Sequence, residues 1–506
     1  MWRRALPQNM AVLALVLAGP VLSPAAQCQP YRLGNVAAPQ LPADRQVREL
    51  QRQLDGLHQT LRKRARLTGL QEAVEQSLLN NPVLAQSYSQ IQAQQWNLIA
   101  VRRQWYPQLS AAAAGSNLFG YRGNTSKSVN SNAPLFIPST SFANGVEASP
   151  AMQLSWTFFN PSRGASINAS SESLRAQQLL FDVAARDLVL ETQLAYFALQ
   201  EQQQLIKDYE LILDSTTQQV ERTEALFNAG SAAISDVEQI RTQQLQNLGT
   251  LINTYRNLVD AAARLAQTMA LPAGELVLPK DKLSLVGRWT LPESETLQQA
   301  ERMREEIQAS LALSSSSSWQ AKSLIYNYWP RFSTNASGSF LNTNSTDGYP
   351  GSAATLNSQG AQWNGAVGLG FSWSIFDGGI NAAQAEQSKA QARQYADQAA
   401  VQRLAVAREV ERTYANYQTS VIALDSTKRQ LQSAQIALEA VRQRFNIGYS
   451  DMTSVVQTYN QSIQAASAYA QSIREFNGAV ASLYRYSARW PDGALPPLQT
   501  RVQTLK

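Results

Sequence analysis

Two long stretches of the chain carry apolar residues at coiled-coil spacing among mostly polar neighbours. Between Gly379 and Phe445 there is no proline and no internal glycine, and apolar positions recur every three, four or seven residues: Val410, Tyr414, Tyr417, Val421, Leu424, Leu431, Leu438, Val441 and Phe445. A second series has the same rhythm: Tyr196, Leu199, Ile206, Leu213, Val220 and Phe227. This spacing predicts a coiled-coil seam. A helix of about 65 residues is on the order of 100 Å long, so such helices should pack side by side as a rod or tube.

Three sequence landmarks occur twice, in the same order. "WYPQLSAAAAGS" at 105–116 recurs as "YWPRFSTNASGS" at 328–339, and "LSWTFFN" at 154–160 recurs as "FSWSIFD" at 371–377. "FNAGSAAISDVEQ" and "FNIGYSDMTSVVQ" form the third pair, and the offsets are 223, 217 and 218 residues. The series indicates two structural repeats, at 68–285 and 290–490. Each is predicted as a helix, a strand pair, a long helix, a tight turn and a helix.

The paired Phe-Asn-x-Gly motifs predict two helix reversals. A helix that reverses direction often ends in a left-handed residue, a conformation that glycine adopts without steric cost; Gly230 and Gly448 fit this role. After the first turn, "SDVE" at 235–238 has the pattern of a capping box that begins the next helix. Thr453 is the expected cap after the second turn.

Four strand candidates lie at about 107–121, 145–159, 330–342 and 363–376, with the weak alternation of membrane barrel strands. Aromatic residues gather at their ends: Trp105, Tyr106, Trp156, Phe158, Phe159, Tyr328, Trp329, Trp373 and Phe376. Such rings fit either an interfacial girdle at the lipid headgroups or the core of a small soluble sandwich. The Ser/Asn/Gly-rich segments 120–145 and 342–362 are predicted to be exposed loops.

Four strands cannot close a barrel, and an open sheet edge cannot face lipid. Two copies would give eight strands and a filled barrel, whereas three would give twelve and leave a bore. The tube of long helices favours three. The predicted fold class is therefore mainly α with a small membrane β-barrel. Long coiled-coil helices form an α-barrel, and four strands per chain contribute to a trimeric twelve-stranded β-barrel, with the seam at Tyr414, Tyr417, Val421 and Leu424 helping to hold the trimer.

The chain ends carry their own signals. Residues 1–27 are predicted to be a secretory signal peptide, because an Arg pair precedes a short apolar run and small residues. No later apolar run reaches about 18 residues, the length of a transmembrane helix, so the exported chain is either soluble or crosses an outer membrane as barrel strands. Cys28 either carries a lipid or has no role. Residues 28–67 are predicted to be an N-terminal extension and 491–506 a C-terminal tail.

Composition excludes several classes of function. The 506 residues include one histidine, His58, and one cysteine, Cys28, and the formal net charge is +6. One histidine and one cysteine are too few for zinc, haem or iron–sulfur ligation or for Cys/His catalysis. We therefore predict that the protein has no metal and no cofactor and is not an enzyme. The mild charge, without basic runs interleaved with aromatics, predicts no nucleic-acid partner.

The duplicated landmarks, together with "NNP" at 80–82, resemble the TolC-like outer-membrane factors over about residues 68–490. The resemblance implies a homotrimer whose barrel lies in outer-membrane lipid and whose helical barrel crosses the periplasm. It implies a passive exit duct for efflux or type I secretion, docked by a periplasmic adaptor and powered by an inner-membrane pump. The alternative is a trimeric coiled-coil structural or adhesive surface protein, for which two matching strand-pair insertions would be awkward.

The resemblance also implies two groups of functional residues. The turns would lie at the periplasmic tip, where helix pairs close the tube and the adaptor docks: Phe227, Asn228, Gly230, Asp236, Phe445, Asn446, Gly448, Tyr449 and Asp451. The strand ends would form the membrane girdle: Trp105, Tyr106, Trp156, Phe159, Trp329, Trp373 and Phe376.

The gate departs from the family pattern. The best-known member narrows its entrance with two acidic positions and clamps it with an Arg after the turn glycine. Here these positions are Ser454, Gln457 and Ser450, all uncharged. Asp236 matches the acceptor of that Arg but lacks the partner, and the helix dipole alone favours an acid there.

The charges left at the second turn are Asp451 and, one turn earlier, Arg442 and Arg444. Asp451 either faces the axis, giving one acidic ring in a trimer, or is a solvated loop residue. We therefore expect closure to rely on packing around Phe445 and Tyr449 rather than on a salt-bridge clamp.

Overall fold

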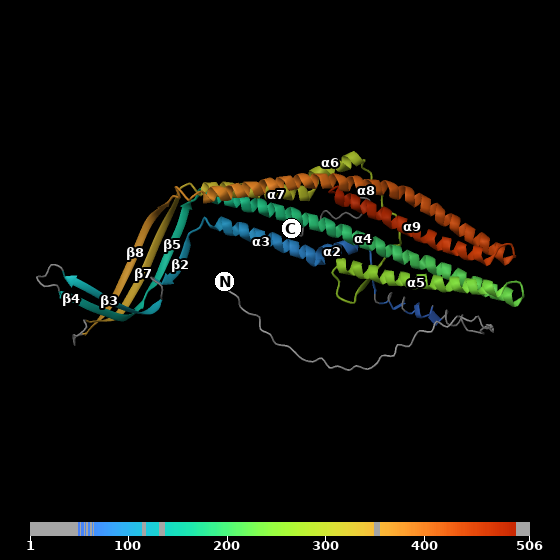
Figure 1. The fold of residues 1–506 in the computed structure, drawn as a ribbon, viewed down its shortest axis with the longest axis horizontal. Coiled ribbons are helices and arrows are strands. Elements are labelled where there is room, and N and C mark those ends of the chain that lie inside the picture. The colour runs from blue at the N-terminus through green and yellow to red at the C-terminus, as the bar shows by residue number, and fades with distance from the viewer. Residues whose placement is uncertain are drawn as a thin grey trace, which may run out of the picture. The chain divides into compact units, whose positions relative to one another are not determined.

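The computed structural model describes residues 65–491, apart from 114–117, 131–136 and 349–354, together with scattered positions between 49 and 63. The predicted signal peptide, Cys28, most of the N-terminal extension and residues 492–506 lie outside the described residues. The described part alternates helices and strands in two successive series (Figure 1). None of its helices is both long and apolar enough to cross a membrane.

The helices are α2 (Leu70–Asn80), α3 (Pro82–Arg103), α4 (Pro161–Asn228), α5 (Ile234–Thr268), α6 (Glu293–Met303), α7 (Glu305–Tyr326), α8 (Ile380–Asn446) and α9 (Met452–Tyr486). The strands are β1 (Ala65–Thr68), β2 (Gln108–Ala113), β3 (Phe119–Asn130), β4 (Ile137–Ala148), β5 (Pro150–Phe159), β6 (Leu276–Pro279), β7 (Arg331–Gly348) and β8 (Thr355–Ser372). The mainly helical fold class with a smaller strand portion is confirmed.

The two long helices are confirmed, with 68 residues in α4 and 67 in α8. The first seam is the buried face of α4, where Tyr196, Leu199 and Val220 are at most 1% exposed. In the second seam Val410 is fully buried, and the Tyr417 ring lies 5.8 Å from that of Phe476 on α9. Tyr417 of the seam therefore packs α8 onto α9 within one chain, while the role of Tyr414, Tyr417, Val421 and Leu424 between chains stays a prediction.

In each repeat, the end of the helix that follows the tight turn meets the start of the helix that leads into the sheet. These pairs are α5 with α3 and α9 with α7. Asn81 caps α3 by accepting from the Val83 N–H at 2.9 Å, and its Nδ2 donates to the carbonyl of Thr268, the last residue of α5, at 2.8 Å. Arg304 precedes α7, and its Nη1 donates to the carbonyl of Tyr486, the last residue of α9, at 3.5 Å. These side chains satisfy carbonyls that a helix end leaves open, so α5 with α3, and α9 with α7, act as interrupted long helices.

The strands between the helices form one antiparallel sheet. β2 pairs with β5 and β3 with β4, so each run of the first hairpin is split into two strands. β7 pairs with β5, with β4 and, on its other side, with β8. The sheet is thus four runs wide. Among the described residues, β8 pairs only with β7, and β2 and β3 have no second partner.

The predicted exposed loops were placed wrongly. Segment 120–145 lies largely in β3 and β4, and β7 and β8 extend to Gly348 and from Thr355, within the predicted loop 342–362. The reason is that antiparallel pairing satisfies backbone groups whatever the side chains are. Ser, Asn and Gly therefore continue the hairpins well beyond the apolar part of the strands.

Candidate functional site

One face of the sheet is apolar across all four runs. Leu109, Leu154, Ala336 and Val367 are neighbours in register, and the flanking rows add Trp156 with Leu369, Phe332 with Phe371, and Phe340 with Trp363. Val367 and Leu369 are each 83% exposed in the single chain. From Phe371 to Trp363 the strand advances eight residues, about 27 Å at roughly 3.4 Å per residue. At the tilt of roughly 35–45° that barrel strands adopt, this length spans about 20 Å along the membrane normal, most of the roughly 25 Å apolar band of membrane barrels.

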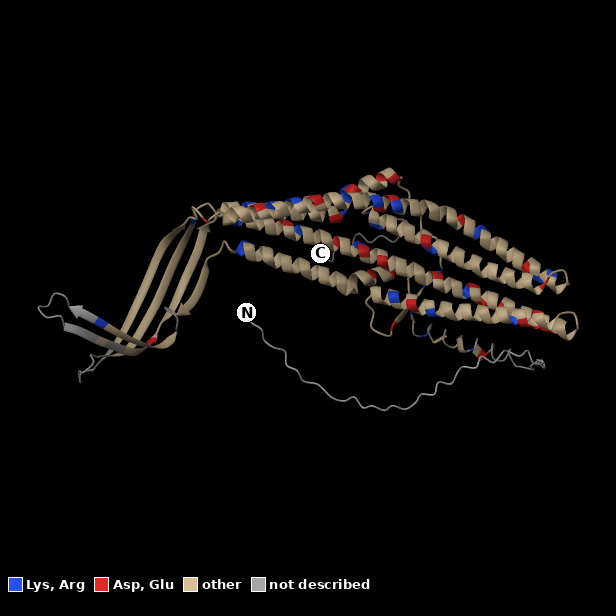
Figure 2. Ribbon diagram, in the orientation of Figure 1, with Lys and Arg blue, Asp and Glu red and all other residues tan. Residues whose placement is uncertain are grey.

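The opposite face is polar and uncharged over the same height. Ser110, Gln153, Ser337 and Ala366 form one register row, and the next contains Gln108, Ser155, Asn335 and Gly368. Figure 2 shows β5, β7 and β8 almost free of charged residues along this length. One hydrocarbon-compatible face and one hydrogen-bonding face are what a sheet between lipid and an aqueous bore requires.

The aromatic residues predicted as a girdle lie where helices meet strands. The Trp156 indole Nε1 donates to the Trp105 carbonyl at 2.9 Å, and in the second repeat Trp373 Nε1 donates to the Tyr328 carbonyl at 2.8 Å. The Arg163 guanidinium lies 4.3 Å from the centre of the Trp105 ring. All seven proposed girdle residues remain exposed: Trp105, Tyr106, Trp156, Phe159, Trp329, Trp373 and Phe376.

The two tip turns have the same backbone geometry. Gly230 and Gly448 adopt φ of 74° and 80°. In the first turn Ser231 N donates to the Leu226 carbonyl at 2.8 Å, and in the second Tyr449 N donates to the Arg444 carbonyl at 2.8 Å. This pattern is a Schellman motif, which ends a helix through a left-handed residue. Since a Cβ added at either glycine would meet no other atom within 4 Å, glycine is needed for backbone conformation rather than for space.

The caps after the turns differ from those predicted. α5 begins at Ile234, and Asp236 Oδ2 accepts from the Ala233 N–H at 3.1 Å, so Ser235 is not the cap. α9 is capped by Asp451, whose Oδ1 accepts from the Ser454 N–H at 2.7 Å, and not by Thr453. Hydrogen bonds from Ser454 hold the pKa of Asp451 below its usual range. Both acids therefore stabilise helix starts.

The remaining tip residues divide into buried and exposed ones. Phe445 is 8% exposed, whereas Phe227 is 39% and Tyr449 82% exposed. Gln219 of α4 donates to Asn446 Oδ1 at 3.5 Å and so links the two hairpins. Of the aromatic pair assigned to closure, Tyr449 is thus the one available to another chain.

Uncharged contacts that sequence reasoning missed join the two hairpins near the tip. The Tyr459 hydroxyl of α9 donates to the Ser215 carbonyl of α4 at 3.0 Å. Gln243 of α5 and Asn460 of α9 exchange two amide hydrogen bonds at 3.1 and 3.2 Å. Tyr459 is fully buried and Gln243 is 1% exposed, whereas Asn460 is exposed, so the Tyr459–Ser215 bond lies deeper in the bundle than the amide pair.

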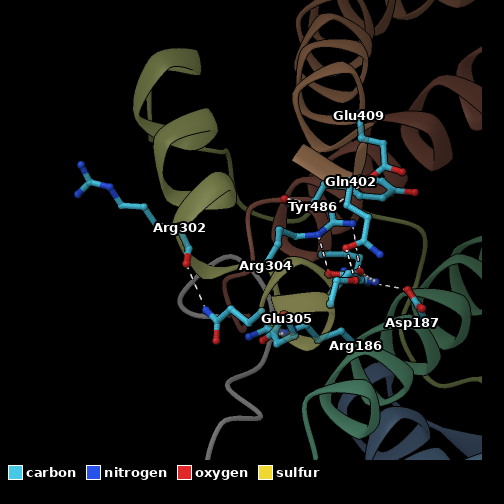
Figure 3. Close-up of polar contacts among 12 residues, drawn as sticks. Arg186, Asp187, Arg302, Arg304, Glu305, Gln402, Glu409 and Tyr486 are labelled. Carbon is cyan, nitrogen blue, oxygen red and sulfur yellow. Dashed lines mark hydrogen bonds and ion pairs between the residues drawn. The ribbon is translucent and has the colours of Figure 1, made fainter. Parts of the chain in front are cut away.

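A buried ion network was also missed. Three arginines and four carboxylates join four helices: Arg186 and Asp187 of α4, Arg304, Glu305 and Glu306 around the start of α7, Glu409 of α8 and Arg485 of α9 (Figure 3). Burial raises the pKa of Glu306, but the charges of Arg485 and Arg304 outweigh it and lower this pKa to about 2. The charge cluster at 301–306, beside a helix break, is the one sequence signal that pointed here.

Taken together, the two-faced sheet and the bundle of long helices define a protein that places strands in a membrane and helices outside it. The family model described as outer membrane efflux protein matches residues 73–271 and 296–489, and the chain belongs to this family.

The chain is similar to outer membrane protein TolC of Escherichia coli (strain K12), with 23% identity over 414 residues that cover 81% of this chain and 80% of TolC. Its fold is similar to that of the outer-membrane channel OprN, with a TM-score of 0.64, 19% identity and coverage of 84% and 93% of the two chains. The CmeC outer membrane channel of Campylobacter jejuni gives a TM-score of 0.64 at 13% identity, with coverage of 86% and 89%. The predicted family is confirmed. The protein lies in the outer membrane, extends into the periplasm and is an exit duct of an efflux system.

Proposed function

We propose that three copies of the chain close their sheets into a twelve-stranded barrel that acts as a passive duct. The observation that carries this proposal is the two-faced sheet, in which the row through Val367 is apolar and the row through Ser337 is polar and uncharged. A sheet of four runs with open edges at β2/β3 and β8 cannot face lipid alone. Joining these edges between copies pairs every strand and leaves a bore at twelve strands.

The repeats 68–285 and 290–490 would each supply one hairpin to a tube across the periplasm. Three copies would place six turns at the tip, with Gly230, Gly448 and their neighbours around the aperture. TolC-like channels act as trimers with adaptor and inner-membrane pump partners. We propose the same partners here, with docking at the two turns and no catalytic step in the chain.

The gate of this duct would be held without a salt-bridge clamp. Supporting this, Asp236 and Asp451 are occupied as helix caps, and the hairpins are joined by the neutral pairs Tyr459–Ser215 and Gln243–Asn460. Opening would separate α9 from α4 and α5 by exchanging these bonds for bonds to water.

Ion conductance of the purified protein in a planar bilayer, with its mass in detergent, tests the proposal. A trimer that is not linked by disulfides and conducts in discrete steps is expected. A monomer or dimer, or a trimer that never conducts, would contradict it and would favour a structural coiled coil.

A further inference from the structure

A cavity of about 10 Å³ lies beside the ion network, between α4 and the end of α9. Arg186 and Gln193 line it from α4, Arg485 lines it from α9, and Arg489 and Trp490 close it from the segment that follows α9. Its lining among the described residues includes three arginines and a glutamine and no acid. The cavity is therefore surrounded by donors and positive charge.

Three buried donors in this lining are unmatched by any described protein acceptor: Arg186 Nη1, Gln193 Nε2 and Arg485 Nη1. The arginines meet their acids through other nitrogens. Arg186 uses Nε for Glu305, and Arg485 uses Nε for Asp187 and Nη2 for Glu306. One Nη1 group of each guanidinium is thus left over beside the cavity that both residues line. A buried donor without an acceptor is costly, so a shared acceptor there stabilises all three.

The side chains that line the cavity carry only positive charge, although Arg186 and Arg485 are each also paired with acids of the ion network. Burial lowers the pKa of Arg186, and the positive charge of Arg485 lowers it further against the opposing effect of Glu305. Burial also opposes the charge of Arg485, but Asp187 and Glu306 outweigh it and raise the pKa of Arg485, so the uncompensated repulsion is felt at Arg186. The Arg186 guanidinium also lies 4.3 Å from the centre of the Trp490 ring, which covers the site on that side.

We propose that this cavity binds one small monovalent anion of the size of chloride. A space of roughly 10–15 Å³ holds about one water-sized particle, so it excludes sulfate or phosphate. A chloride ion, which is larger than a water molecule, fits where the Trp490 ring and the arginine side chains move slightly outward. The anion accepts from both Nη1 groups and from Gln193 Nε2, and so ties α4 to the last turn of α9. The site is independent of the duct proposal, because it lies within one chain.

Crystals of the full-length protein grown in sodium bromide test the site directly. An anomalous peak within hydrogen-bonding distance of Arg186, Gln193 and Arg485 is expected. A water molecule at that place, or no density, would overturn the proposal.

Thermal unfolding followed by circular dichroism gives a second test. Chloride should raise the melting temperature saturably, relative to gluconate or sulfate at equal ionic strength. Gln193→Glu supplies a carboxylate in place of the anion and should abolish this dependence. The control is Gln200→Glu on the same helix, where the side chain contacts the Asp281 and Lys282 carbonyls instead and chloride dependence should persist. Equal chloride dependence in Gln193→Glu and the unaltered protein would contradict the site; if Gln193→Glu does not fold, the bromide map decides alone.

Discussion

Ala270 and Ala488 lie 218 positions apart and adopt the same left-handed conformation, with φ of 53° and 57°. Each follows the C-cap of a tip helix, and the next residue closes the same 6→1 hydrogen bond: Leu271 to Ala266 and Arg489 to Tyr484. The repeats thus share their backbone at the end of α5 and of α9, as they do at the tip. Unlike the tip turns, these two ends use alanine, which the left-handed conformation disfavours by about 1–2 kcal/mol.

Replacing Ala488 with glycine should therefore stabilise the protein. Relief of the left-handed strain exceeds the entropy of a freer unfolded chain, so we expect a gain of up to about 1 kcal/mol. Ala479→Gly, inside α9, should destabilise by about 1 kcal/mol. Melting temperatures measured by circular dichroism test this prediction. A lower melting temperature for Ala488→Gly than for the unaltered protein would contradict the claim that Ala488 is strained.

At the tip, glycine already occupies the left-handed position, and replacing it should introduce strain. Gly448→Val forces a β-branched residue to φ near 80°, at about 1–3 kcal/mol per site. The trimer should assemble because the sheet is remote in the fold, while export in a complementation assay should fall. Gly249→Ala, at a helical glycine of α5 without left-handed φ, should leave export unchanged. Normal export by Gly448→Val would show that the turn is not important for the duct.

Asp451 has two properties that substitutions can separate: its negative charge and its role as the N-cap of α9. Block by multivalent cations should be weak, and both Asp451→Ala and Asp451→Asn should remove what remains. Only the alanine variant should lose stability, by about 1 kcal/mol, because asparagine still accepts from Ser454 N. Strong block that survives in both variants would place the constriction at other residues.

Acid should weaken the ion network through Glu306. Its pKa is about 2 in the folded protein against 4.5 unfolded, so its contribution is fully present above pH 4.5 and is lost as the pH falls toward 2. The shift corresponds to about 3 kcal/mol. Glu306→Gln should destabilise at pH 7 and flatten the pH profile of unfolding between pH 5 and 3, whereas Asp425→Asn, in an exposed pair with Arg429, should change neither. An unaltered profile in Glu306→Gln would mean that this carboxyl is not held ionised by Arg485 and Arg304.

The long helices and tight turns could be predicted because their determinants are local. The seam through Tyr196 and Leu199 is a periodicity within one segment, and Gly448 marks its turn by itself. The extended hairpins could not be predicted, because residues such as Ser126 and Asn144 have loop composition and become strands only through pairing. Ser126 pairs with Ser141 across its hairpin, and Asn144 pairs in addition with the distant Thr346 of β7.

The ion network and the neutral contacts at the tip escaped prediction for the same reason. Arg485 meets Asp187 across 298 positions, and Asn460 meets Gln243 across 217. No spacing rule along the chain connects such residues. The cap at Asp451 was accessible in principle, since an Asp three residues before the N–H it accepts is a common helix start.

A duct requires the polar face of the sheet to line a bore, and single cysteines on β7 test this requirement directly. In a Cys28→Ser background, which leaves no other cysteine, Ser337→Cys lies on the polar face and Ala336→Cys next to it on the apolar face. Labelling in proteoliposomes with a charged, membrane-impermeant thiol reagent should modify Ser337→Cys and reduce its conductance, and should leave Ala336→Cys untouched. Equal labelling of the two positions, or labelling of Ala336→Cys alone, would contradict a duct walled by these strands.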